Sequence, residues 1–267
     1  MVNVHSNPDT IIDTVESILA FGSPNILLLI NGASWDELSP MQVSVPKVKA
    51  LPHRVPRSPY RNVALGLKLL TEHWPKADWY CYTEYDTLFA SDRFQRNLSL
   101  AEENGLWMLG TNGRVDEAQM PLVESLIGEK FRSVYYLLGC CLFFHRNFIA
   151  KLGEMEFFDR FLFLTNGFSE GYFPAYSGYD VSEHMYPTLC RHLGGKVGVF
   201  STWDENRLEW HGAYRFFPMR WKPELDPDTE NFPEASILHP LKTFDHPIRK
   251  YHRERRFAWN TLRQAEK

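Results

Sequence analysis

Residues 79–86 read Trp79-Tyr80-Cys81-Tyr82-Thr83-Glu84-Tyr85-Asp86. The first five are aromatic or β-branched in character, and such a run predicts a buried strand. Two carboxylates follow at once, although carboxylates avoid burial unless a cation or hydrogen-bond donors satisfy them. At the carboxyl end of a sheet strand, a divalent metal that carries a phosphorylated ligand is such a partner. The stretch therefore predicts a metal and phosphate site, and a solvated turn is the plainer alternative.

The segments around this stretch alternate between strand and helix patterns. Apolar runs of strand length cover 2–5, 26–30, 79–83 and 106–109, and a weaker one covers 43–48. Helical spacing of apolar residues covers about 8–21 and 59–70, and a third helix is expected over 91–105. Such alternation is typical of a parallel sheet with right-handed crossovers. We therefore predict an α/β fold.

The second half of the chain is less regular. A long apolar strand is expected over 134–144, a helix over 181–192 and a further strand over 197–200. Residues 203–236 are rich in Trp, Pro and acidic residues, which predicts long loops.

Length and composition limit the class of protein. The 267 residues suit one α/β domain, or one domain with an appendage, and 44% hydrophobic content argues against general disorder. The net charge of −4 does not favour nucleic acid as a partner. No segment is typical of a signal peptide or a membrane span, so we expect a cytoplasmic protein. The four cysteines lack metal-site spacing and are expected to be reduced structural thiols: Cys81, Cys140, Cys141 and Cys190.

Basic residues gather in the tail, 246–267, where a helix is expected. Three interpretations stay open, namely a solvated helix, peripheral contact with anionic lipid at the inner face of the membrane, and, least favoured, nucleic-acid contact. Phe257, Trp259 and Leu262 accompany the charges, which is the basis for the lipid interpretation.

Five short motifs occur in a fixed order along the chain. They are Tyr60-Arg61-Asn62-Val63-Ala64-Leu65-Gly66, the acidic triplet Glu84-Tyr85-Asp86, Leu138-Gly139-Cys140-Cys141-Leu142-Phe143, Asp180-Val181-Ser182-Glu183-His184, and Ile237-Leu238-His239-Pro240-Leu241-Lys242. Together they resemble the GT-A glycosyltransferases, enzymes that use nucleotide-diphosphate sugars and carry an acidic triplet, usually Asp-x-Asp. Two positions depart from the family pattern: Glu84 replaces the first Asp, and Asn31 stands where many relatives have Asp.

The resemblance implies a GT-A fold, Rossmann-like, with a mostly parallel central sheet flanked by helices and a smaller acceptor-side sheet. It implies one domain over 1–245, divided into a nucleotide-binding half, 1–110, and an acceptor and catalytic half, 111–245, followed by the tail. It also implies a UDP- or GDP-sugar donor, a glycan, lipid-linked or other hydroxyl acceptor, and Mn²⁺ or Mg²⁺.

The resemblance also assigns site residues. The metal ligands are expected to be Asp86, His239 and Glu84, of which Glu84 can instead contact ribose or metal-bound water. An imidazole nitrogen among the ligands would favour Mn²⁺ over Mg²⁺. The residues expected to contact the donor are His5, Asn7, Asn31, Arg61, Glu84, Tyr85, Asp86 and Lys242.

An inverting transferase needs a general base on the acceptor side of the sugar. Glu183 and Asp180 are the candidates, with His184 as a weaker third. The spacing of Asp180 and Glu183 also fits a helix capping box, with Asp180 as N-cap and Glu183 at the third helical position. Aromatic residues near this segment are expected to contact sugar faces: Tyr172, Phe173, Tyr176, Tyr179, Trp203 and Trp210.

These expectations lead to one principal function and two alternatives. The principal one is a metal-dependent glycosyltransferase that transfers a sugar to an acceptor hydroxyl, with inversion by direct displacement. The first alternative is a non-catalytic carbohydrate-binding protein with a degenerate transferase fold. The second is a sugar-1-phosphate nucleotidyltransferase, which needs a Gly-rich basic loop where this chain has His5-Ser6-Asn7-Pro8-Asp9.

Overall fold

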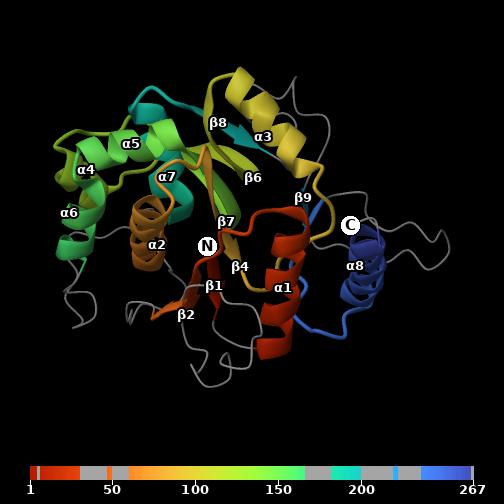
Figure 1. Cartoon of the computed structure of the whole chain (residues 1–267). Helices are drawn as coiled ribbons and strands as arrows, with labels where there is room; N and C mark the ends of the chain where they lie inside the picture. Colours follow the sequence, from red (N-terminus) through yellow and green to blue (C-terminus); the bar gives the residue numbers. More distant parts are fainter. Residues whose placement is uncertain are drawn as a thin grey trace.

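The computed structural model describes residues 1–4, 7–30, 47–49, 60–165, 182–199, 219–221 and 236–265. Within these ranges the chain forms a seven-stranded sheet with helices on both faces (Figure 1). The strands of this sheet, in spatial order, are β3 (Lys47–Lys49), β2 (Leu28–Ile30), β1 (Val2–Val4), β4 (Trp79–Glu84), β7 (Val134–His145), β6 (Leu106–Asp116) and β8 (Lys196–Val199). The helices are α1 (Pro8–Phe21), α2 (Tyr60–His73), α3 (Phe94–Glu103), α4 (Pro121–Ile127), α5 (Arg146–Glu154), α6 (Phe157–Leu164), α7 (Ser182–His192) and α8 (Pro247–Ala265).

Most strands of this sheet run in one direction. β1 pairs in parallel with β2 and β4, β2 pairs in parallel with β3, and β6 pairs in parallel with β8. β7 lies between β4 and β6 and is antiparallel to both. The prediction of an α/β fold with a mostly parallel central sheet is therefore confirmed. The sequence did not indicate the reversed direction of β7.

The two faces of the sheet bury separate apolar clusters. One contains Val63 and Leu67 of α2 together with side chains of α4, α5, α6 and α7. The other contains Ile11 and Val15 of α1 together with Phe94 of α3. Because both faces are covered, the strands are apolar along most of their length, as β4 already showed in the sequence.

Some element boundaries differ from the sequence-based expectation. The third helix begins at Phe94, not at Ser91, and has no side-chain cap. The strand expected over 106–109 extends to Asp116 because it pairs with β7 along much of its length. The segment 157–164, for which no element was predicted, is helix α6 and packs Phe157 and Phe161 in the core.

A second, three-stranded sheet positions the end of the chain beside β4. It consists of β5 (Leu88–Phe89), β10 (Ile237–His239) and β9 (Met219–Trp221), in that order. β10 is antiparallel to β5 and parallel to β9, with Leu238 opposite Leu88. A smaller second sheet was predicted and is confirmed. Because β5 follows β4 after a short turn, this pairing places His239 close to the acidic end of β4.

The tail helix α8 packs on α1, as Figure 1 shows. Arg249 and Arg256 of α8 are buried against Asp13 of α1. Part of the basic tail therefore belongs to the folded core, whereas the division of the chain at 245 stays a prediction. No helix within the described ranges is both long and apolar enough to cross a bilayer.

Candidate active site at the carboxyl end of β4

The acidic stretch lies where the central strands end. The backbone N–H of Tyr85 donates to Asn3 O at 3.1 Å, which ties the turn after β4 to the end of β1. Glu84 is the last residue of β4 and Asp86 lies in the turn that follows. In α/β sheets, ligands bind at the carboxyl ends of the strands. The two carboxylates therefore occupy the edge of the sheet where a ligand site is expected.

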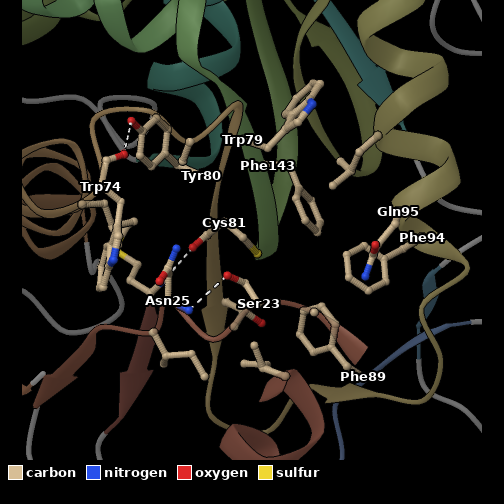
Figure 2. A pocket seen from close by; sticks show the side chains of 18 of the residues that line it. Ser23, Asn25, Trp74, Trp79, Tyr80, Cys81, Phe89, Phe94, Gln95 and Phe143 are labelled. Carbon is tan, nitrogen blue, oxygen red and sulfur yellow. Dashed lines mark hydrogen bonds between the residues drawn. The ribbon is translucent and has the colours of Figure 1, made fainter. Parts of the chain in front are cut away.

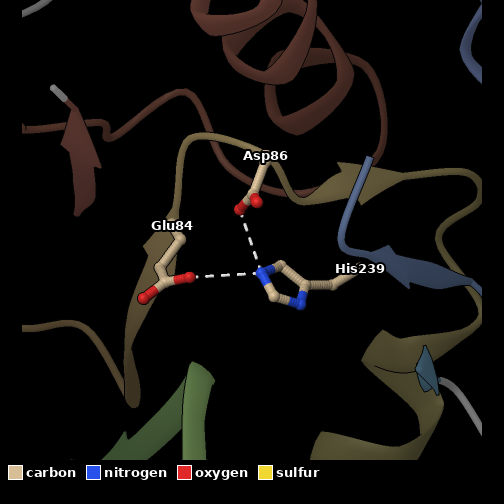
Figure 3. Close-up of side chains that lie close together, drawn as sticks. All are labelled: Glu84, Asp86 and His239. Carbon is tan, nitrogen blue, oxygen red and sulfur yellow. Dashed lines mark hydrogen bonds and ion pairs between the residues drawn. The ribbon is translucent and has the colours of Figure 1, made fainter. Parts of the chain in front are cut away.

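His239 completes a cluster with these carboxylates (Figure 3). Its Nε2 lies 2.9 Å from Asp86 Oδ1 and 3.2 Å from Glu84 Oε2. Asp86 and His239 are buried, whereas Glu84 is half-buried. The structure thus brings His239 to two carboxylates that lie more than 150 positions earlier in the sequence.

The cluster shifts the pKa values of its members. Burial alone lowers the pKa of His239, but hydrogen bonds with Asp86, Cys140 and Glu84 outweigh it and hold this pKa well above its ordinary value. Burial alone raises the pKa of Asp86, but the hydrogen bond with His239 outweighs it and lowers this pKa. Without a metal ion, the cluster therefore favours an imidazolium beside carboxylates.

The donor set fits a hard divalent cation. Glu84, Asp86 and His239 each offer one ligand atom, and these atoms lie within 4.8 Å of one another. Two carboxylate oxygens and one imidazole nitrogen suit Mn²⁺, which accepts both ligand types. A cation between them would take the place of the proton on His239, because metal binding needs the neutral imidazole.

Glu183 stands in the first turn of α7 and faces β7. Its Oε1 accepts a hydrogen bond of 2.8 Å from the backbone N–H of Gly139. The capping box expected of Asp180 and Glu183 stays a prediction, because Asp180 lies outside the described residues. Burial raises the pKa of Glu183, the Gly139 hydrogen bond opposes this, and the charge of Glu84 raises it further. This charge interaction connects Glu183 with the cluster of Glu84, Asp86 and His239.

His184, the third candidate base, faces another carboxylate. Its Nε2 lies 3.4 Å from Asp116 Oδ2, and its ring lies against Tyr136 with centroids 4.9 Å apart. Burial lowers the pKa of His184, and the attraction of Asp116 opposes this only in part. The side chain is buried, which gives it a packing role beside Glu183.

A polar group beside this helix was not predicted from the sequence. Arg114 forms an ion pair with Asp116, and its guanidinium lies 4.2 Å from the centroid of the Tyr136 ring. Residues 112–116 resemble a polar loop in sequence, so their place in β6 was not predicted. The available signal was the spacing of Arg114 and Asp116, which puts both on one face of a strand.

The other predicted donor-binding residues that the structure describes lie in three different surroundings. Asn7 Nδ2 donates to the Lys242 carbonyl at 3.2 Å, and Lys242 itself is exposed and lowers the pKa of Asp86 through its charge. Arg61 is buried, and its Nε donates to Thr165 Oγ1 at 3.0 Å. The ring of Tyr85 is buried in the apolar cluster between α1 and the sheet, which gives it a packing role. Donor contacts of these residues stay predictions.

Three predicted site residues lie outside the described residues: His5, Asn31 and Asp180. The same holds for all six aromatic residues expected on the acceptor side. Of the two candidate bases, the structure therefore describes only Glu183.

A mostly apolar cavity lies beside β4 (Figure 2). Its volume is about 350 Å³, and its lining includes Trp74, Trp79, Phe94 and Phe143. The lining follows β4 from Trp79 to Thr83, and the cluster residues Glu84, Asp86 and His239 are not part of it. The described residues of its lining are mostly apolar and include no carboxylate and no histidine.

Comparisons with known proteins give structural likenesses only. No family model and no curated protein sequence matches the chain. The galactosyltransferase LgtC, in complex with donor and acceptor sugar analogs, is similar at 14% identity over 96% of this chain and 94% of that chain, with a TM-score of 0.46. A glycosyltransferase involved in glycosylation of the major capsid of PBCV-1 is similar at 9% identity over 95% and 97%, with a TM-score of 0.44.

A third solved structure is a 4-diphosphocytidyl-2C-methyl-D-erythritol synthase from Anaerococcus prevotii. It is similar at 12% identity over 79% of this chain and 88% of that chain, with a TM-score of 0.42. Likenesses of this degree describe only the general arrangement of the chain.

Proposed function

We propose that the chain is a metal-dependent glycosyltransferase that moves a sugar from a UDP- or GDP-sugar to an acceptor hydroxyl, with inversion. The observation that carries this proposal is the convergence of Glu84, Asp86 and His239 at the carboxyl end of β4. Carboxylates and imidazole at this edge of an α/β sheet suit a cation that accompanies a diphosphate.

Asp86 and His239 would hold the cation, with Glu84 as a third ligand or a contact to bound water. When bound, Mn²⁺ or Mg²⁺ supplies positive charge that offsets the negative charge developing on the leaving diphosphate. Lys242, which is exposed beside this cluster, would add a point charge toward the phosphates.

Glu183 would act as the general base. Its carboxylate would take the proton of the acceptor hydroxyl while the acceptor oxygen bonds to the anomeric carbon and the bond from that carbon to the diphosphate breaks. A raised pKa makes a carboxylate a stronger base near neutral pH. The Gly139 hydrogen bond fixes one oxygen of Glu183, so the other oxygen is the one that would meet the acceptor.

The test combines binding and turnover. Wild-type protein is titrated by calorimetry with UDP- and GDP-sugars, with and without Mn²⁺, and then assayed for sugar transfer and donor hydrolysis. Asp86→Ala is expected to remove the metal-linked affinity and to lower transfer by at least about 10²–10³-fold. The control is Asp245→Ala, because Asp245 is an exposed acid on the segment after β10.

Two outcomes would contradict the proposal. Full transfer by Asp86→Ala, or by wild type in excess chelator, rules out the metal-dependent mechanism. Glycan binding without metal-linked nucleotide affinity, transfer or donor hydrolysis supports the non-catalytic alternative.

Lipid vesicles with and without anionic headgroups test the proposed contact of the tail with the membrane.

A further inference from the structure

Arg249 of α8 is a fully buried arginine that contacts four separate groups. Its Nη1 donates to Asp13 Oδ2 at 2.7 Å and its Nη2 donates to Thr14 Oγ1 at 3.0 Å, both on α1. Its Nε donates to Leu241 O at 2.8 Å, and Nη2 also lies 3.5 Å from Thr87 O. A planar guanidinium presents these donors in a fixed fork, so it can hold several groups in one geometry.

Two of these contacts reach the turn that carries Asp86. The Thr14 hydroxyl lies 2.5 Å from Tyr85 O and 2.8 Å from Thr87 O, the carbonyls on either side of Asp86. The hydroxyl can donate its proton to these carbonyls while it accepts the hydrogen bond from Arg249. Thr14 therefore connects the guanidinium to the backbone on both sides of Asp86.

Another contact reaches the segment that carries His239. Leu241, whose carbonyl accepts from Arg249, lies two residues after His239. The backbone N–H of Leu241 donates to Asp86 O at 2.8 Å, so this residue joins both segments. Arg249 thus lies where the turn after β4, the end of β10 and α1 meet.

We propose that Arg249 is a positioning residue of the metal centre, which holds the segments of Asp86 and His239 at the separation that a cation needs. This inference rests on the proposed function, since it assumes that the cluster binds a metal. Groups that orient metal ligands typically contribute about 10–100-fold to metal affinity. Arg249 would act through the backbone, without touching the cation or the substrate.

The same helix supplies a matched control. Arg256 is also buried and also pairs with Asp13, and it forms a second ion pair with Glu16 of α1. Both arginines therefore fasten α8 to α1 through one carboxylate. These polar contacts of Arg256 lie on α1, whereas those of Arg249 extend to Leu241 and Thr87. If α8 only stabilised the fold, substitution of either arginine would have the same effect on Mn²⁺ affinity.

The experiment measures Mn²⁺ affinity and thermal unfolding on the metal-free full-length protein. Wild type, Arg249→Lys, Arg256→Lys and Thr14→Val are titrated with Mn²⁺ alone at one fixed pH, with unbound Mn²⁺ followed by electron paramagnetic resonance. Each lysine keeps the positive charge but lacks the planar guanidinium that holds several acceptors in one geometry. Thr14→Val has nearly the shape of wild type, so it tests the link to Asp86 even where Arg249→Lys fails to fold.

Arg249→Lys and Thr14→Val are expected to bind Mn²⁺ about 10–100-fold more weakly than wild type. Arg256→Lys is expected to keep wild-type affinity while its melting temperature falls. Equal losses of affinity in Arg249→Lys and Arg256→Lys, or unchanged affinity in Thr14→Val, would overturn the inference and leave the proposed function intact. Absence of Mn²⁺ binding by wild type would overturn the metal centre and the inference together.

Discussion

Gly139 and Glu183 fit each other closely across β7 and α7. The Gly139 N–H donates to Glu183 Oε1 at 2.8 Å, and a Cβ placed on Gly139 would lie 2.9 Å from Glu183 Cγ and 3.0 Å from Oε1. Only a residue without a side chain lets the carboxylate approach this backbone amide. The glycine that interrupts the apolar run 134–144 thus makes room for the proposed base.

Glu183→Gln is expected to fold normally and to lose sugar transfer by about 10²–10⁴-fold, the usual contribution of a general base. The amide oxygen still accepts the Gly139 hydrogen bond, so the loss would come from the missing basic group. Mn²⁺ affinity, measured by titration, should stay near the wild-type value. A variant with wild-type turnover would exclude Glu183 as the base.

The same substitution should change stability in a direction set by the raised pKa of Glu183. Because the folded-state pKa lies above the unfolded-state value, the wild-type protein loses stability as the pH rises through the interval between them. Gln does not titrate, so Glu183→Gln should be more stable than wild type above this interval. The advantage should disappear in acid, below the ordinary pKa of glutamate. Urea unfolding across this pH range checks the sign.

Gly139→Ala is expected to displace the Glu183 carboxylate and to lower kcat by about 10²-fold, the typical cost of a misplacement of 1 Å. Gly153→Ala is the matched control, since a Cβ there meets nothing within 4 Å and the position lies in α5. Alanine in an exposed helix is the better helix former, so this control should be slightly more stable and fully active. Similar kinetics in both variants would contradict the conclusion that Gly139 positions the Glu183 carboxylate.

The parts of the fold that the sequence predicted well depend on local patterns. Helix α1 runs from Pro8 to Phe21, between Asn7 and Gly22, because the proline, the apolar spacing and the glycine all act within the segment. β4 and its acidic end were predicted for the same reason. The cluster of Glu84, Asp86 and His239 needed more than local patterns, and the family resemblance supplied the link between the distant residues.

The rest depends on contacts between distant segments, which local patterns do not contain. β7 lies between β4 and β6 and pairs with both in the antiparallel direction. Its apolar run suits either direction, so the direction was not evident from the sequence. The burial of Arg249 depends on Asp13, 236 residues away, whereas the surrounding basic residues read as a solvated tail. The donor contacts expected of His5 and Asn31, and the role expected of Asp180 as a candidate base, concern positions outside the described residues.

Lys242→Met is expected to weaken binding of a nucleoside diphosphate by several-fold while the Mn²⁺ site persists. Lys242 is exposed and acts on Asp86 only through its charge, so its effect should be screened by salt. Calorimetry with UDP and GDP at low and high ionic strength measures the difference, which should shrink as salt rises. The control Lys250→Met removes an exposed charge from α8. An equal effect of both variants would show that nucleotide binding depends on the overall positive charge and not on Lys242 in particular.

The raised pKa of His239 predicts that Mn²⁺ binding depends on pH. In the metal-free protein, the imidazolium bound to Asp86 and Glu84 adds stability that is complete below the unfolded-state pKa and is lost as the pH rises through the folded-state pKa. Mn²⁺ must displace this proton, so its affinity should rise by up to about tenfold per pH unit until the folded-state pKa is passed. Asp86 keeps its charge over this range because its pKa is lowered.

Calorimetric titrations in buffers of different ionisation enthalpy count the protons released when Mn²⁺ binds. About one proton per ion is expected below the folded-state pKa of His239, and none well above it. His239→Gln offers an oxygen ligand in place of the imidazole, so it should bind Mn²⁺ more weakly and with a much flatter pH dependence. If wild type releases no proton at neutral pH, His239 is either neutral without metal or not a ligand, and the electrostatic account of the cluster fails.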